Sequence, residues 1–201
     1  IFSFFIVWRL SNEFLRNKNL SLFSVLLLET IYFYNFTSPE FNVNICQLPF
    51  WALTVYYSWK LYNKKNIDIK DCALLGIFAA FGFLSKYLFI YLLVSIDLLF
   101  FYLIFIKKDK KYDFNYVISF IVFIVFLIPH IIWLINNDYI TVSYGLHRTG
   151  LSEPNFIDHF KYPIIFLFKQ IIILIPFFIL SLFMVSKLKF NFKFTDRKLF
   201  F

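Results

Sequence analysis

The sequence has few charged residues and little glycine, two features on which most soluble domains rely. Of its 201 residues, 16% are charged and 4 are glycine, whereas 61% are hydrophobic and 24% are aromatic. An ordinary water-soluble domain has about a quarter of its residues charged, so this composition excludes that class. It indicates a chain whose main solvent is the lipid bilayer.

Sequence motifs of soluble enzymes and of cysteine-based sites are also missing. The chain has no glycine-rich phosphate loop, no serine nucleophile elbow and no HExxH motif. Its only cysteines, Cys46 and Cys72, begin successive apolar segments from opposite sides. Neither a disulfide between them nor a cysteine metal site is therefore expected.

Long apolar segments dominate the chain instead. Residues 116–135, YVISFIVFIVFLIPHIIWLI, contain no acidic residue, lysine or arginine. A helix of about twenty such residues crosses a hydrocarbon core of about 30 Å. Further spans are expected over residues 1–8 (the end of a span), 20–36, 45–62, 72–86, 88–106 and 163–185. The predicted fold class is an all-α polytopic transmembrane helix bundle, with residues 1–201 forming a single domain.

Most of the 20 basic residues fall on one side of the membrane if these spans alternate. That side receives Arg9, Arg16, Lys18, Lys60, Lys64, Lys65, Lys70, Lys107, Lys108, Lys110, Lys111, Lys187, Lys189, Lys193, Arg197 and Lys198. The positive-inside rule assigns it to the cytoplasm. Because these bases occupy short loops between apolar helices, the net charge of +8 is a topology signal, and nucleic-acid binding is set aside.

The opposite side carries two polar segments, residues 35–44 and 136–162. The second is predicted as a long loop that opens directly from the helix containing Pro129 and His130. Loops of this length without secondary structure are uncommon unless they are functional or disordered. A candidate site is therefore expected on the non-cytoplasmic side.

Three runs of sequence together resemble a known family. They are EFNVNICQLPFWALTVYYSWKLY, LLGIFAAFGFLSKYLFIYLL and LIPHIIWLINNDYITVSYGLHR. They are similar to glycosyltransferase family 39 and its aminoarabinose-transferase-like relatives, membrane enzymes of the GT-C fold. The resemblance implies transfer of a sugar from a polyprenyl-phosphate carrier to a lipid, glycan or protein acceptor. The reaction would take place on the non-cytoplasmic face of a bacterial inner (plasma) membrane, with the protein surrounded by membrane lipids.

The resemblance also implies roles for individual residues. LSKY at 84–87 matches a turn at an outer helix end that brings a lysine, here Lys86, followed by Tyr87, close to the carrier phosphate. A His–Arg pair that faces the phosphate and the donor sugar corresponds to His147 and Arg148. Further substrate contacts are expected from His130, Glu40, Asn42 and Asn44. The family's general base lies in an earlier outer loop, so the sequence is expected to be a fragment, inactive alone, that lacks the catalytic acid.

Each of these residues also has a purely structural explanation. Lys86 could extend its ammonium group to the membrane interface, and His130 could bond carbonyls released by Pro129. Asparagines such as Asn42 and Asn44 commonly cap helix starts. Arg148 beside His147 could be an ordinary solvated loop residue.

No cofactor is assigned from the sequence. Glu40 and His147 could ligate a divalent metal, but two ligands are too few to define a site. Glu29, Asp97 and Lys169 lie within spans and are expected to pair inside the bundle. The alternative functions are a secondary transporter, which would show broken helices at matching positions of two repeats, and a noncatalytic membrane scaffold.

The predicted topology can be tested by labelling. Cysteines introduced at Ser38 and Ser143, after replacement of Cys46 and Cys72, should both react with an impermeant thiol reagent applied to intact cells. Both positions are assigned to the non-cytoplasmic side by the distribution of basic residues. Labelling of one position without the other would contradict this assignment.

Overall fold

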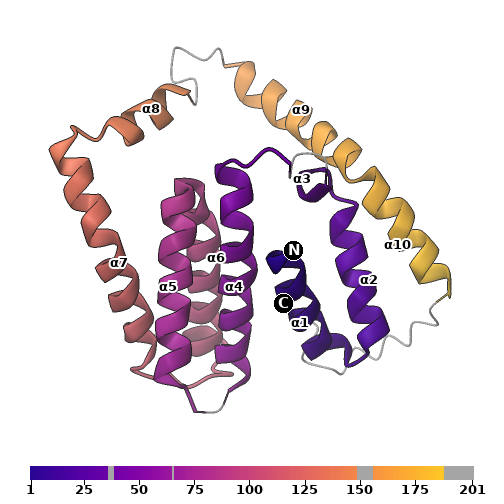
Figure 1. Ribbon diagram of the computed structural model, residues 1–201, viewed down its shortest axis with the longest axis horizontal. Coiled ribbons are helices and arrows are strands. Elements are labelled where there is room, and N and C mark those ends of the chain that lie inside the picture. Colours follow the sequence, from indigo (N-terminus) through magenta and orange to yellow (C-terminus); the bar gives the residue numbers. More distant parts are fainter. Residues whose placement is uncertain (36–38, 65, 149–155, 188–201) are drawn as a thin grey trace. The chain divides into compact units, whose positions relative to one another are not determined.

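The computed structural model describes residues 1–35, 39–64, 66–148 and 156–187, without the side chains of residues 33, 148 and 183–187 (Figure 1). Among these residues the regular structure is helical, and no strand occurs. The chain forms two compact units, Ile1–Ile6 with Phe41–Thr149 and Val7–Glu40 with Gly150–Phe201. The predicted all-α polytopic fold class is confirmed.

The first unit is built around helix α5. Its elements are α4 (Val43–Asn63), α5 (Ile69–Ser85), η1 (Tyr87–Phe89), α6 (Ile90–Phe101), η2 (Tyr102–Ile106), α7 (Tyr116–Asn136) and α8 (Ile140–Arg148). Helix α5 packs against α4 on one side and α7 on the other (Figure 1). A Cβ at Gly76 would collide with the backbone oxygen of Ser119, so only glycine permits this approach of α7.

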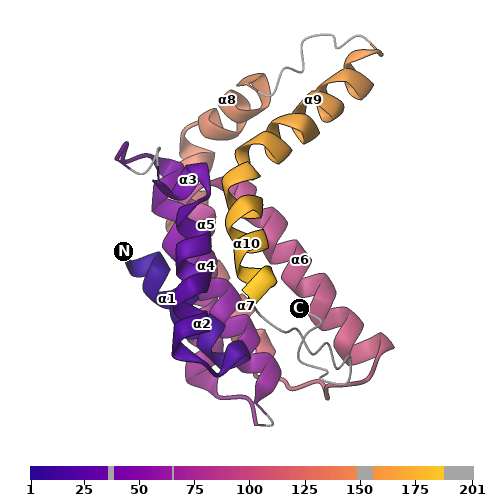
Figure 2. The same cartoon turned by 90° about the vertical axis from the view of Figure 1, so that its right-hand side faces the viewer.

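Two continuous helices of this unit are long and apolar enough to cross a membrane. They are Tyr87–Ile106, which has 20 residues and combines η1, α6 and η2, and Tyr116–Asn136, which has 21. Helices α4 and α5 occupy the predicted segments 45–62 and 72–86. They are not among the helices that are both long enough and apolar enough to cross a membrane. Figure 2 shows the ribbon of α6 diverging from α5 toward its C-terminal end.

The second unit contains α2 (Lys18–Glu29), α3 (Tyr32–Asn35), α9 (Asp158–Ile173) and α10 (Ile175–Lys187), while α1 (Phe2–Leu15) contributes to both units. Helix α2 begins at Asn17, whose side chain accepts hydrogen bonds from the N–H groups of Asn19 and Leu20. It packs against α10. Helices α9 and α10 are bent by 46°, and together they form a third candidate span.

The structure divides two segments that were expected to be single spans. The segment 20–36 contains α2 and the separate short α3, and the segment 163–185 is interrupted between α9 and α10. At the first break the hydroxyl of Thr30 donates to the carbonyl of Leu27, 2.6 Å away, which satisfies a carbonyl at the end of α2.

The segment 136–162, expected to be one long loop on the non-cytoplasmic side, contains helix α8 and the start of α9. Asp138 and Tyr139 adopt left-handed backbone conformations, with φ values of 49° and 54°. They turn the chain between α7 and α8. Residues 36–38 and 149–155 of the two polar segments lie outside the described residues.

A buried carboxylate joins α4 to α5 at the lysine-rich end of the first unit. Asp71, 4% exposed, accepts hydrogen bonds from Lys60 and Lys64 at 2.7 and 2.6 Å. Asp71 precedes the apolar segment that begins at Cys72. Although burial disfavours its carboxylate, the two lysines outweigh this and hold the pKa of Asp71 below its ordinary value. The hydrogen bond with Asp71 likewise raises the pKa of Lys64.

Neutralising this carboxylate should destabilise the first unit. Asp71→Asn removes the charge that pairs with two lysines, and we expect the melting temperature in detergent at pH 7 to fall by on the order of 5 °C. Because the folded pKa is lowered, the carboxylate stabilises the fold above the ordinary carboxyl range and loses this effect as the pH falls through the folded pKa. The difference between variant and wild type should therefore shrink in acid.

Asp68→Asn is the matched control for this measurement. Asp68 caps α5 by accepting a hydrogen bond from the N–H of Lys70, which an asparagine also does, and its side chain is 48% exposed. Its melting temperature should stay near that of the wild type. An equal fall in both variants, or none in Asp71→Asn, would contradict the role assigned to Asp71.

Candidate functional site

The end of the first unit opposite the lysine-rich turn brings together three segments that are distant in the sequence. They are the start of α4, the turn between α5 and η1, and the end of α7 with the start of α8. Five residues from these segments form what we call the Lys86 cluster, namely Asn44, Lys86, Tyr87, His130 and Thr141.

Lys86 is positioned by the end of α5. Its backbone is extended, with φ −161° and ψ 126°, and its N–H donates to the carbonyl of Gly82 at 3.2 Å. The ammonium Nζ of Lys86 donates to Oδ1 of Asn44 at 2.6 Å, across 42 positions of sequence. A lysine has three donors, and Asn44 is a neutral acceptor. The positive charge is therefore oriented by the protein without being neutralised at this contact.

Tyr87 connects the same turn to α7 and α8. Its hydroxyl lies 2.7 Å from Nε2 of His130 and 2.8 Å from Oγ1 of Thr141. The hydroxyl has one hydrogen, so one neighbour receives it while the other can donate to the phenol oxygen. The three groups form a short hydrogen-bonded chain whose direction depends on the tautomer of His130.

His130 is further held by ring stacking. Its imidazole stacks on the indole of Trp133, with centroids 5.8 Å apart and planes 12° apart. One structural explanation for His130 was a bond to a carbonyl released by Pro129. The contact that the structure gives to Nε2 is instead the hydroxyl of Tyr87.

Asn42 caps α4 rather than contacting Lys86. Its side-chain oxygen accepts hydrogen bonds from the N–H groups of Asn44 and Ile45 at 2.9 and 3.3 Å. The first of these bonds fixes the backbone of Asn44, the residue that holds Lys86. Glu40 is exposed and belongs to the second unit.

The predicted His–Arg pair lies at the C-terminal end of α8. His147 is exposed, whereas the side chain of Arg148 lies outside the described residues. The convergence of Arg148 with Lys86 therefore stays a prediction. Among the residues that the structure describes, no group of three or more His, Cys, Asp or Glu side chains could hold a metal ion.

Sequence reasoning did not select Thr141 as part of the site. Its role depends on the corner that Asp138 and Tyr139 make, which carries α8 back toward Tyr87. The available signal was local: an aspartate, followed by hydroxyl-bearing residues, directly after an apolar helix.

The hydrogen bond between Tyr87 and His130 should shield His130 from modification. In Tyr87→Phe, Nε2 of His130 loses its hydroxyl partner, and its rate of carbethoxylation by diethylpyrocarbonate should rise about 5- to 10-fold, as loss of a bond of about 1 kcal/mol implies. Peptide mass spectrometry measures this rate. The exposed His147 is the internal control, and its rate should not change. An unchanged rate at His130 would show that Tyr87 does not protect it.

Comparison with known proteins gives one family. The family model described as dolichyl-phosphate-mannose-protein mannosyltransferase matches residues 1–133, a range that includes Asn44, Lys86, Tyr87 and His130. No curated protein and no solved structure matches the chain.

Proposed function

The chain belongs to the dolichyl-phosphate-mannose-protein mannosyltransferase family, and we propose that its Lys86 cluster binds the phosphate of a polyprenyl-phosphate-linked sugar donor. The match to this family confirms that the chain is a GT-C-like membrane glycosyltransferase, as the resemblance of its sequence motifs indicated. With two continuous membrane-type helices, the protein is an integral membrane protein.

The proposal rests on the observation that the hydrogen-bond partner of the Lys86 ammonium, Asn44, is a neutral residue. At the lysine-rich end, Lys60 and Lys64 are paired with the carboxylate of Asp71. Lys86 is instead held by the amide of Asn44, which orients the ammonium and leaves its charge uncompensated. An ammonium at a membrane interface with unused donors is suited to a phosphate oxygen.

The chemistry of transfer makes such a charge useful. The acceptor oxygen bonds to the anomeric carbon of the sugar while the bond from that carbon to the carrier phosphate oxygen breaks. The electron pair stays on the phosphate, which changes from a singly charged diester to a doubly charged monoester. Because negative charge grows on the phosphate during the reaction, Lys86 stabilises the transition state more than the bound donor.

The remaining residues of the cluster position this charge. Tyr87 ties the turn that carries Lys86 to His130 and Thr141, so the turn has support from two further helices. The cluster contains no carboxylate, and the acceptor proton therefore passes to a group outside it. In this proposal His147 and Arg148, which follow the cluster on α8, contact the donor or the acceptor. The substrate contact expected from Glu40 stays a prediction.

The distribution of basic residues between the two ends of the first unit supports one orientation in the membrane. The lysine-rich end faces the cytoplasm, and the Lys86 cluster faces the opposite side of a bacterial inner membrane. The prenyl chain of the donor lies against apolar helices, where each buried CH₂ contributes about 0.8 kcal/mol. The acceptor is a lipid, glycan or protein on the non-cytoplasmic side.

Removing the charge of Lys86 should slow sugar transfer. In the full-length protein, Lys86→Gln should lower kcat/KM about 10- to more than 100-fold, because a charge-assisted contact to the phosphate contributes about 1.5–3 kcal/mol. Transfer of radiolabelled sugar from a polyprenyl-phosphate donor measures this at matched membrane expression. Arg148→Gln tests the second predicted cation in the same assay.

Lys70→Gln is the matched control for the charge. Lys70 is an exposed lysine at the start of α5, at the other end of the same helix, and its removal should leave transfer near normal. If Lys86→Gln transfers sugar as well as Lys70→Gln does, Lys86 does not bind the phosphate and its ammonium only reaches the interface.

A further inference from the structure

A lysine-rich loop follows the span Tyr87–Ile106 at the end of the first unit that lies away from the Lys86 cluster. Its residues 107–111 read KKDKK, and they begin directly after Ile106. Within 60–71 and 107–113, the two stretches that meet at this end, the sequence has eight lysines and four aspartates. Clusters of lysine immediately next to a membrane span are the sequence pattern of anionic-lipid recognition. The excess positive charge at this end therefore favours an anionic partner.

Backbone and side-chain contacts fold this loop back against the end of the span. Lys108 has a left-handed backbone, with φ 54°. The N–H of Asp109 then donates to the carbonyl of Leu103 at 3.0 Å, and Nζ of Lys110 donates to two carbonyls at the end of α4. A left-handed lysine is uncommon and persists where such contacts hold it. The lysines of the loop are therefore kept beside the end of the span.

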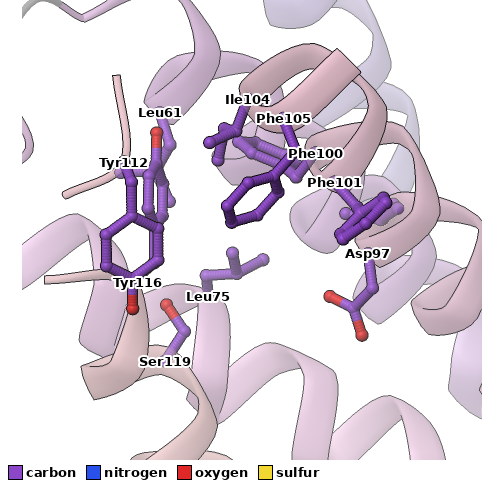
Figure 3. A pocket seen from close by; sticks show the side chains of 11 residues that line it. Leu61, Leu75, Asp97, Phe100, Phe101, Ile104, Phe105, Tyr112, Tyr116 and Ser119 are labelled. Carbon is purple, nitrogen blue, oxygen red and sulfur yellow. The ribbon is translucent and has the colours of Figure 1, made fainter. Parts of the chain in front are cut away.

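Exposed aromatic rings mark the depth of this loop in the membrane. Tyr102, in η2, is 46% exposed, and Tyr112, at the end of the loop, is 53% exposed. The ring of Tyr112 contacts that of Phe105, with centroids 6.3 Å apart. Figure 3 shows Tyr112 at a cavity of about 260 Å³ that Phe105 and Leu61 also line. Because tyrosine is enriched where a protein passes from hydrocarbon to headgroups, we expect residues 107–111 to lie at the level of the headgroups.

Only part of the positive charge of the loop is compensated by the protein. Lys107 pairs with Asp109 at 2.9 Å, and the ammonium group of Lys110 is bonded to the carbonyls at the end of α4. Lys108 and Lys111 are exposed and make no hydrogen bond or ion pair within the described part of the chain. These two ammonium groups lie on one folded loop and are available to an anion.

We propose that this loop binds the headgroup of an anionic phospholipid, with the ammonium groups of Lys108 and Lys111 donating to its phosphate oxygens. Charge-assisted hydrogen bonds of this kind are roughly twice as strong as neutral ones. The acyl chains of the same lipid would lie against the exposed side chains of Phe105 and Ile106, directly before the loop. The site lies at the opposite end of the span from Tyr87 and does not depend on the function proposed for the Lys86 cluster.

Other partners fit this loop less well than an anionic lipid. A zwitterionic lipid also has a phosphate, but its own cation would lie beside the lysines. Exposed lysines hold a free anion weakly, because water hydrates and screens their charge. A lipid phosphate is already held at the depth of the lysines by its acyl chains, so less freedom is lost on binding. An acidic protein would have to reach the same depth among the headgroups.

The test measures lipid binding to the full-length protein in detergent by native mass spectrometry. Dioctanoyl phosphatidylglycerol is compared with dioctanoyl phosphatidylcholine, which has the same chains and no net charge. The anionic lipid should bind at least about tenfold more tightly, and raising the ammonium acetate concentration should reduce this difference because salt screens exposed charges. Equal binding of the two lipids, or competition by glycerol phosphate as strong as that by the anionic lipid, would overturn the proposal.

Charge variants locate the lipid on the loop. Replacing both lysines together, Lys108→Gln with Lys111→Gln, should weaken binding of the anionic lipid about 10- to 30-fold, which corresponds to about 1 kcal/mol for each lysine near a lipid surface. Lys108→Arg with Lys111→Arg is the matched control, because it keeps both charges in place, and its binding should stay near that of the wild type. Undiminished binding in the glutamine variant, or an equal loss in both variants, would show that these charges do not hold the lipid.

Asp109→Asn should change the binding in the opposite direction. It removes the acid that pairs with Lys107, so a third ammonium group becomes available and the anionic lipid should bind about fivefold more tightly. Such a gain does not arise from misfolding, and it decides the question if the glutamine variant does not fold. Unchanged or weaker binding in Asp109→Asn would contradict the proposal.

Discussion

The packing of α5 between α4 and α7 is the constraint on which the rest of the first unit depends. Helices in a bilayer gain little from excluding lipid, so they associate through close van der Waals contact and small residues. Gly76 provides such a contact with α7, and Ala79 and Ala80 are buried in the same stretch of α5. Because α5 is held on both sides, the positions of Asp71 and Lys86 at its two ends are fixed together.

The lysines at the two ends of α5 have different kinds of hydrogen-bond partner. At the start of α5, a buried carboxylate gathers two lysines, and Lys110 adds hydrogen bonds to the carbonyls of Leu61 and Lys64. Those charges stabilise a turn. At the other end, the amide of Asn44 holds one lysine without cancelling its charge. The same residue type thus serves structure where its partner is an acid and is available to a ligand where its partner is neutral.

The parts of this architecture that the sequence could predict depend on composition and local pattern. The segment 116–135 differs from α7 by one residue, because a run of apolar residues without charge has few alternatives in a membrane. The break between two helices at Lys86 was also predicted. Asn42 was considered as a helix cap, and it caps α4. The breaks within 20–36 and 163–185 were not predicted, although Pro176 lies in the first turn of α10, where proline is favoured.

The composition of the site was predictable only in part, for a physical reason. Lys86, Tyr87, Asn44 and His130 could be selected from motifs, but their pairing crosses more than 40 positions of sequence and depends on the packing of three helices. Thr141 enters through the turn of the chain after α7, which local patterning did not predict. Tertiary contact thus decides which of the selected residues meet.

The corner between α7 and α8 has a mechanical consequence. Two residues with positive φ make it, a conformation that costs non-glycine residues energy and is retained where neighbouring contacts hold it. Thr141, just beyond the corner, is bonded to the hydroxyl of Tyr87. A rotation of α8 that relaxes the corner must break this bond and release the turn next to Lys86. The position of α8 and the position of the turn that carries Lys86 are therefore mechanically connected through one hydrogen bond.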